Sequence, residues 1–367
     1  MSTLRKILSP ILFPISLIYG FIIYIRNRFY DYKIFKSNQF NIPLISVGNI
    51  TVGGTGKTPH IEYLIKILES EFNIATLSRG YKRKTKGFVL STSDSTDREI
   101  GDEPRQIKQK FPNINVAVDA DRTNGINQLL KKTKDLDIIL LDDAYQHRKV
   151  HTNLSILLID YSRPIDKDFI LPFGDLREQA FEKKRANIII ITKSPKNLKP
   201  IERRFIFNKL ESYPFQHVFF TTFDYGELCS VYNFEEKSNN QDTYSDYDIL
   251  LVTGIANPKP LKEHILENIS KKIHELEYSD HYNFKESDLK RIEQKYNSIN
   301  SDKKIIITTE KDAMRLQKFS NIANNLKDSF FYIPIQVEFL NDRTDNFNQQ
   351  IIEYVRKNKK HSFLYPG

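Results

Sequence analysis

The sequence predicts an α/β protein: a doubly wound, mainly parallel sheet, a second, smaller α/β domain, and a membrane-associated helix at the N-terminus. Three observations support this prediction. Apolar, β-branched runs alternate with helical stretches over most of the chain, a polar segment at 235–248 interrupts the alternation, and residues 7–25 carry no charge. Near-continuous apolar runs are typical of strands buried on both faces, as in parallel sheets.

The apolar runs indicate where the strands lie. Each run has the length of a strand and most are followed by a stretch with helical periodicity. Beyond the polar segment, which indicates a loop or a domain joint, the same rhythm predicts the smaller α/β unit. The runs are 43–50, 73–80, 113–120, 136–144, 154–161 and 186–193 in the first unit and 248–256, 304–311 and 330–339 in the second, and an amphipathic helix is expected at 345–356.

The length of 367 residues is enough for roughly two domains, each with its own core. Four parts are expected along the chain. They are an N-terminal anchor with a basic flank (1–36), an α/β core (37–215), a smaller α/β domain (216–340), and a C-terminal helix and tail (341–367).

Composition excludes some classes of protein and favours anionic partners. The single cysteine, Cys229, cannot form an internal disulfide, and no Cys/His cluster has zinc-ligand spacing. A net charge of +9 favours nucleic acid, acidic lipid or a phosphorylated substrate. No recognition helix or aromatic-basic strand motif accompanies this charge, so a nucleic-acid partner is not expected, and no obligate protein partner is evident.

The N-terminal segment 7–25, ILSPILFPISLIYGFIIYI, is near the minimum length that spans hydrocarbon. A cleaved signal peptide is one alternative, but no small-x-small cleavage site follows. A buried soluble helix is another, but Pro10 and Pro14 are expected to break one long helix into pieces. Membrane attachment is favoured, as a span or an embedded kinked hairpin. Because more Lys and Arg follow the segment than precede it, the main body is expected in the cytoplasm.

A glycine-rich stretch after the first predicted strand indicates a nucleotide site. Residues 46–59 read SVGNITVGGTGKTP, with threonine where the G-x-x-x-x-G-K-[ST] pattern has its first glycine. Strand, glycine turn and helix start follow one another, so backbone N–H groups and the helix dipole can converge on phosphate oxygens. A glycine-rich turn with a chance GKT is the alternative. The predicted nucleotide-binding residues are Thr51, Gly53, Gly54, Thr55, Gly56, Lys57 and Thr58.

Two consecutive carboxylates, Asp142 and Asp143, follow the apolar run LDIILL. A phosphate-loop enzyme needs a carboxylate at the end of a neighbouring strand to organise its metal. Together with the Thr58 hydroxyl, these residues predict a Mg²⁺ site and a Mg-ATP-dependent phosphoryl transfer or hydrolysis. Paired acids at a strand end are otherwise helix caps or loop residues.

Eight blocks of the chain carry a further signal: 47–59, 77–84, 100–104, 141–148, 171–178, 253–258, 279–284 and 308–316. In sequence and order they resemble the blocks of the tetraacyldisaccharide 4'-kinase family. In that family the phosphate loop carries threonine at its first position, so Thr51 looks like a family trait. Ala144, Tyr145 and Asp175 depart from the residues that the family often has there, and Asp175 leaves the shape of the 171–178 loop open.

This resemblance implies an ATP-dependent kinase that phosphorylates the 4'-hydroxyl of a tetraacylated glucosamine disaccharide 1-phosphate in lipid A biosynthesis. It implies further that Asp102 of IGDEP and His281 of SDHYNF form a catalytic carboxylate-histidine dyad. Which of the two takes the proton stays open. The alternatives are that Asp102 caps a helix and that His281 is a hydrogen-bonded loop residue.

Further residues match the family's blocks with weaker assignments. Gln146 and His147 contact nucleotide phosphates or the metal shell, or else cap the turn after the strand. Arg177 and Glu178 line the active site or form a surface salt bridge. Arg79 begins a basic loop, and a solvated charge run is the usual explanation for such a loop. Because the loop follows the carboxyl end of a parallel strand, which faces the ligand crevice, a contact of Arg79 with a phosphate or with the substrate headgroup is expected instead.

One rival function comes from another class: a membrane-associated P-loop ATPase of the partitioning or positioning type. Its loop is similar, but it carries a lysine early in the loop where this chain has Thr51. Its membrane element is also usually a short amphipathic helix rather than a long uncharged run.

Overall fold

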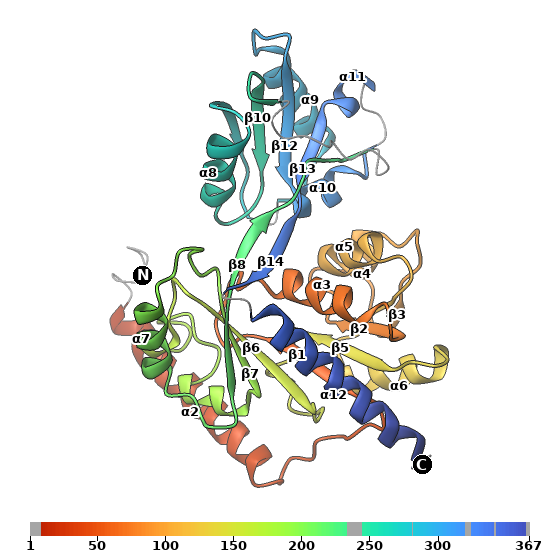
Figure 1. The fold of residues 1–367 in the computed structure, drawn as a ribbon, viewed down its shortest axis with the longest axis vertical. Helices are drawn as coiled ribbons and strands as arrows, with labels where there is room; N and C mark the ends of the chain where they lie inside the picture. The colour runs from red at the N-terminus through yellow and green to blue at the C-terminus, as the bar shows by residue number, and fades with distance from the viewer. Residues whose placement is uncertain (1–8, 233–243, 281, 320–323, 341–342, 365–367) are drawn as a thin grey trace. The chain divides into compact units, whose positions relative to one another are not determined.

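The computed structural model describes residues 9–232, 244–280, 282–319, 324–340 and 343–364. They form two compact units (Figure 1). The first comprises 1–95, 107–223 and 337–367, and the second comprises 96–106 and 224–336. The predicted α/β class with a large, mainly parallel sheet is confirmed.

The first unit is built on a nine-stranded sheet whose central strand, β1, lies between β5 and β6. All its pairings from β4 to β8 are parallel, and β3 joins antiparallel at the edge. Parallel strands put their carboxyl ends at one edge, where ligands bind in doubly wound folds. The strand order is β14 (Ile335–Phe339), β8 (His217–Tyr225), β7 (Ile188–Thr192), β6 (Leu154–Asp160), β1 (Leu44–Gly48), β5 (Ile138–Asp142), β2 (Ile74–Ser78), β4 (Asn115–Val118) and β3 (Val89–Leu90).

Helices cover both faces of this sheet because its strands are apolar on both sides. Along β1, Ile45 and Val47 join one core and Leu44 joins the opposite one, as the two-residue period of a strand requires. The first core contains α3 (Lys57–Leu68) and α12 (Thr344–Leu364), and the other face carries α6 (Arg122–Lys132) and α7 (Pro200–Leu210). The remaining elements are η1 (Ile165–Lys167), η2 (Ala180–Arg185) and α5 (Asp102–Lys110), which begins in the second unit and ends in the first.

The second unit has a five-stranded sheet with two apolar faces. Along β10, Leu250 and Val252 join one core and Ile249 and Leu251 the other. The strand order is β11 (Lys272–Glu277), β10 (Asp248–Thr253), β12 (Lys304–Thr309), β13 (Phe330–Ile333) and β9 (Cys229–Ser230). Its helices are α4 (Asp97–Ile100), α8 (Lys259–Asn268), α9 (Glu286–Asn297), α10 (Glu310–Leu316) and α11 (Asn324–Asp328).

The N-terminal segment forms one helix, α2 (Ser9–Asp31), with Pro14 inside it. The expectation that Pro10 and Pro14 break the helix is wrong. Pro10 lies in the first turn, where an N–H has no intrahelical partner anyway, and the helix continues through Pro14. Among the described residues, this helix alone is long and apolar enough to cross a membrane. It packs along the first unit: Ser16 Oγ donates to the Ile170 carbonyl, and Gln179 Nε2 donates to the Gly20 carbonyl at 2.6 Å.

The structure differs from the predicted boundaries and elements in four places. Residues 216–223 extend the first sheet as β8, and 96–106 pack in the second unit. The run 330–339 is two strands, because Pro334 has no N–H to donate, and its halves join different sheets. The strand β11, in which only Leu276 is buried, was not predicted. Of the predicted joint at 235–248, residues 235–243 lie outside the described residues.

Candidate active site

The phosphate loop connects the carboxyl end of β1 to the first turn of α3, as predicted. Gly53 and Gly56 have φ of 95° and 91°, a region that favours glycine. A Cβ at Gly56 would also lie 2.4 Å from the Phe223 ring. Thr51 lacks a positive φ and pairs with Leu176 as an isolated antiparallel bridge. A side chain is therefore tolerated at the position where the usual pattern has glycine.

Buried polar side chains hold the loop in place. Thr192 Oγ1 donates to the Thr55 carbonyl at 2.9 Å, and Asn49 Nδ2 donates to Thr55 Oγ1 at 2.9 Å. His60 lies 2.8 Å from the Gly56 carbonyl through Nδ1 and 3.1 Å from Thr221 Oγ1 through Nε2. Burial lowers the pKa of His60 to about 4, so the ring is neutral at pH 7.

Two cations outside the predicted set also contact the loop. Lys193, directly after β7, donates through Nζ to the Gly54 carbonyl at 2.5 Å and to Asp160 Oδ2 at 2.7 Å. Arg163 donates through Nη1 to the Val52 carbonyl at 3.1 Å. The sequence signal for Lys193 was its position directly after a buried parallel strand, as Asp143 directly follows β5.

The two predicted carboxylates end β5 beside the loop, since Val47 of β1 pairs with Asp142 in register. Asp142 is buried, and Asp143 takes a left-handed conformation with φ of 47°. Asp143 lies 3.5 Å from Lys57 Nζ and 3.2 Å from Arg177 Nη1. Burial raises the pKa of Asp143, but the charges of Lys57 and Arg177 outweigh it and hold the pKa below its ordinary value. The structure thus brings Lys57, Asp143 and Arg177 together.

Gln146 and His147 follow in the next turn. Gln146 Nε2 donates to the Asn49 carbonyl at 2.8 Å, which ties this turn to the start of the phosphate loop. Burial, followed by the charges of Arg122 and Arg79, lowers the pKa of His147 to about 4. Arg79 itself is exposed after β2. The turn therefore carries a neutral imidazole beside cations, a setting that favours an anionic ligand.

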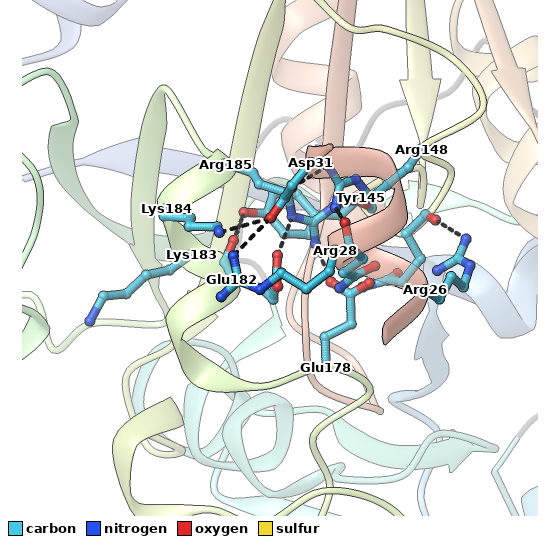
Figure 2. A network of polar contacts seen from close by, with 12 residues as sticks. Arg26, Arg28, Asp31, Tyr145, Arg148, Glu178, Glu182, Lys183, Lys184 and Arg185 are labelled. Carbon is cyan, nitrogen blue, oxygen red and sulfur yellow. Dashed lines mark hydrogen bonds and ion pairs between the residues drawn. The ribbon is translucent and has the colours of Figure 1, made fainter. Parts of the chain in front are cut away.

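A charged network anchors the end of α2 to this side of the sheet (Figure 2). Asp31 pairs with Arg148 at 2.7 Å and with Lys184 at 3.1 Å. Glu178 is fully buried and pairs with Arg185, whose guanidinium lies 4.3 Å from the Tyr145 ring centroid. Glu178 thus belongs to the anchoring network, whereas the neighbouring Arg177 contacts Asp143. Sequence analysis did not single out Asp31, Arg148 or Arg185 for this role.

In the second unit, Asp102 stands at the first position of α5 and accepts from Arg315 Nη2 at 2.7 Å. Its neighbour Glu103 pairs with Lys311 at 2.6 Å. Asp312 is buried, accepts from the Gly254 N–H and pairs with Arg315 at 2.9 Å. The predicted partner of Asp102, His281, lies outside the described residues. Arg315 was not predicted, although it lies in the block 308–316.

The chemistry of the loop region suits a phosphate ester and a hard cation. No cluster of three His, Cys, Asp or Glu forms among the described residues. Mg²⁺, however, binds through one or two carboxylates and completes its shell with substrate phosphates and water. Thr58, Asp142 and Asp143 provide oxygen donors of that kind at the carboxyl edge of the sheet.

The chain is similar to known proteins over nearly its full length. Residues 8–356 match the family model described as tetraacyldisaccharide-1-P 4'-kinase. A tetraacyldisaccharide 4'-kinase of Phocaeicola vulgatus is 46% identical over 353 residues, covering 96% of each chain. One from Flavobacterium johnsoniae is 45% identical, covering 96% of this chain and 99% of its own. The LpxK crystal structure from Aquifex aeolicus in complex with ATP superposes with a TM-score of 0.73 at 28% identity, covering 96% of this chain and 99% of that one.

The depressed pKa of His60 makes a prediction about stability. The folded pKa of about 4 lies below the ordinary value of 6.5, so the unfolded chain binds the proton more readily between these pH values. The contribution of His60 is therefore complete above pH 6.5 and is lost as the pH falls towards 4, by up to about 1.4 kcal/mol per pH unit. We expect His60→Gln to flatten the decline in the free energy of unfolding over this range, measured by urea denaturation. An unchanged slope, with the exposed His151→Gln as control, would contradict this.

Proposed function

We propose, from the premise that the chain belongs to the tetraacyldisaccharide-1-P 4'-kinase family, how its own residues carry out the family's reaction. The chain is an ATP-dependent kinase of lipid A biosynthesis that phosphorylates the 4'-hydroxyl of a tetraacylated disaccharide 1-phosphate. The observation that carries the proposal is the phosphate loop with Lys57, Asp143 and Arg177 in contact beside it. The family match over residues 8–356 argues against the alternative interpretation, a P-loop ATPase of the partitioning or positioning type.

We infer that the loop from Thr51 to Thr58 binds the ATP phosphates. The N–H groups of its glycines and the first turn of α3 are the donors, and Lys57 adds charge at the outer phosphates. The Lys57 ammonium lies 3.5 Å from Asp143 Oδ1. Gln146 and His147 are proposed to line the same site, since Gln146 holds the Asn49 carbonyl at the start of the loop.

Thr58, Asp142 and Asp143 are the residues that would hold Mg²⁺. Their hydroxyl and carboxylate oxygens are the ligand type that Mg²⁺ prefers, and the depressed pKa of Asp143 keeps it ionised. The ion would neutralise charge on the phosphates being transferred. Arg177, on the other side of Asp143, is proposed to orient that carboxylate and to meet phosphate charge, and Glu178 to hold the segment that carries Arg177. Arg79 is proposed to contact a phosphate of the nucleotide or of the substrate headgroup.

The attacking hydroxyl must lose a proton, and we propose that Asp102 and His281 form the group that receives it. The support is the match of both residues to the family's blocks. Arg315, bonded to Asp102 through both Nε and Nη2, restricts the carboxylate to one orientation. A fixed orientation is what an acid-base group needs, because proton transfer depends on geometry before pKa.

We propose that α2 attaches the enzyme to the cytoplasmic face of the inner membrane by lying in the surface. Its apolar side chains Leu17, Ile18, Phe21 and Ile22 are exposed, between 58% and 63%. Its other side is bonded to the protein body from Ser16 to Asp31. A helix held along its length by a polar domain presents one face to lipid, so an embedded helix is favoured over a spanning one.

The kinase proposal predicts transfer in a defined assay. Detergent-solubilised protein, Mg-ATP and a tetraacylated disaccharide 1-phosphate should give 4'-phosphorylated product. Lys57→Ala should reduce the rate at least about 10²-fold, because it removes a charge that stabilises the developing phosphate charge. Lys131→Ala, an exposed lysine on α6, is the control. Equal rates for Lys57→Ala and the native chain would contradict the proposal.

The dyad proposal predicts that Asp102→Ala and His281→Ala each lower kcat by about 10²- to 10⁴-fold while ATP affinity is kept. The double variant should be no worse than the slower single one, since two residues that act as one unit are not additive. Asp94→Ala and His151→Ala, both exposed, are matched controls. Near-native turnover in either dyad variant removes that residue from catalysis.

The membrane proposal predicts that Ile18→Asn together with Phe21→Asn weakens vesicle binding about 10- to 100-fold, because two inserted apolar side chains are lost. Kinase activity in detergent should stay within about twofold, as neither side chain packs on the body. Leu130→Asn removes an apolar residue of α6 that is 42% exposed and should leave binding unchanged. Vesicle binding unaffected by the double variant would show that another surface carries the attachment.

A further inference from the structure

A cavity of about 550 Å³ opens in the first unit on the side of α7. Arg203 and Arg204 of α7 and Arg343, just before α12, line it together with His217 at the start of β8. Its remaining walls are largely apolar and include Phe207, Phe220 and Leu340. None of these residues belongs to the phosphate loop, to the carboxylates after β5 or to the network around Asp31. The cavity is therefore a separate feature with its own chemistry.

The three guanidinium groups have no carboxylate partner within ion-pair distance in the part of the chain that the structure describes. Arg203 Nε is moreover buried without a hydrogen-bond acceptor among the described residues. Buried donors normally have acceptors, and an unmet one is costly. Arginine presents a planar fork of donors that matches the oxygens of a phosphate. The cavity thus has the charge and the donors of a phosphate site.

The outer face of α7 is apolar where a water-exposed helix would be polar. Ile201 and Phe205, four residues apart and hence on one face, are 70% and 67% exposed. Within α7 only Leu210 is fully buried. Phe215, which follows the helix, is exposed as well. An apolar face beside a cationic cavity is typical of a helix that lies at a membrane surface.

Contacts connect α7 to the proposed membrane helix α2. Lys209 of α7 pairs with Asp166 of η1 at 3.0 Å. Beyond η1, the Phe169 ring packs on Phe173 at 5.0 Å, and Phe173 packs on Phe13 of α2 at 5.5 Å. Phe169 is itself half exposed. Exposed apolar side chains thus occur on α2, at Phe169 and on α7. Figure 1 shows α2 and α7 on the same side of the first unit.

We propose that the cavity binds the phosphate headgroup of an anionic membrane lipid and that α7 is a second membrane contact. The inference rests on the proposed attachment through α2 and deepens it. A single helix in the membrane surface leaves the body free to roll about the helix axis. A second contact removes that freedom and holds the first unit in one orientation over the lipid that it phosphorylates. The guanidinium groups supply selectivity for acidic lipid, and Ile201 and Phe205 supply apolar burial.

The test is vesicle co-sedimentation of the full chain at physiological ionic strength. The arginine variant combines Arg203→Gln and Arg204→Gln. Its control, the lysine variant, combines Lys131→Gln and Lys134→Gln and removes the same charge from exposed positions around the end of α6. On vesicles containing phosphatidylglycerol, the arginine variant should bind about tenfold more weakly than the native chain, and the lysine variant within about twofold. On pure phosphatidylcholine the arginine variant should bind like the native chain.

Kinase activity in detergent separates this inference from the proposed function. Both variants should keep it, because the cavity is not part of the phosphate-loop site. If the arginine variant loses its preference for acidic vesicles and keeps full kinase activity, the inference is supported. If the native chain itself shows no kinase activity, the proposed function is contradicted, and the vesicle result still tests the inference independently. Phe205→Asn should weaken binding to both kinds of vesicle.

Three results would overturn the inference. One is equal binding of the arginine variant and the native chain to acidic vesicles, and another is an equal loss in the lysine variant. The third is a result from inorganic phosphate: the native chain binds it saturably, the arginine variant does not, and both bind vesicles equally. The cavity would then be a site for a free anion. If the double arginine variant does not fold, Arg343→Gln, at an exposed position, replaces it and should show a smaller loss of the same kind.

Discussion

The structure of the site depends on the conformation of the phosphate loop, whose glycines leave no room for side chains at Gly56. The loop is held from several elements at once: Thr192 at the end of β7, His60 in α3 and Asn49 after β1 each bond to its backbone or to Thr55. These partners are buried, so their hydrogen bonds are not exchanged for water. Because β1 and β7 belong to one set of parallel strands, their carboxyl ends bring Asn49 and Thr192 to the same edge of the sheet.

The apolar helix α2 is linked to that loop by a short series of hydrogen bonds. Arg26 donates to the Gln146 carbonyl, Gln146 donates to the Asn49 carbonyl, and Asn49 donates to Thr55. Asp31 and the buried Glu178 fasten the same helix and the segment carrying Arg177. The helix α2 is thus tied into the polar framework of the first unit. Residues that support the proposed phosphate site bond directly to residues of this apolar helix.

Much of the fold could be predicted from the sequence. Buried parallel strands need apolar residues on both faces, so β1, β5, β6, β7 and β12 appear in the sequence as apolar runs that predict strands. The edge strand β11 carries alternating polar residues and β8 is only partly apolar, so neither run stood out. The packing of residues 96–106 in the second unit was also not predicted. It depends on the ion pairs of Asp102 with Arg315 and of Glu103 with Lys311, whose partners lie more than 200 positions away in the chain.

For this protein the sequence by itself determined the phosphate loop, its partner carboxylates, the apolar anchor and the family, because each is a local pattern of residue types. The tertiary structure alone decided which side chains meet: Arg177 on Asp143, Lys193 on Gly54, Glu178 on Arg185, and three arginines around one cavity. Contacts of that kind join residues far apart in the chain. Their partners are set by strand order and helix packing, which no local pattern specifies.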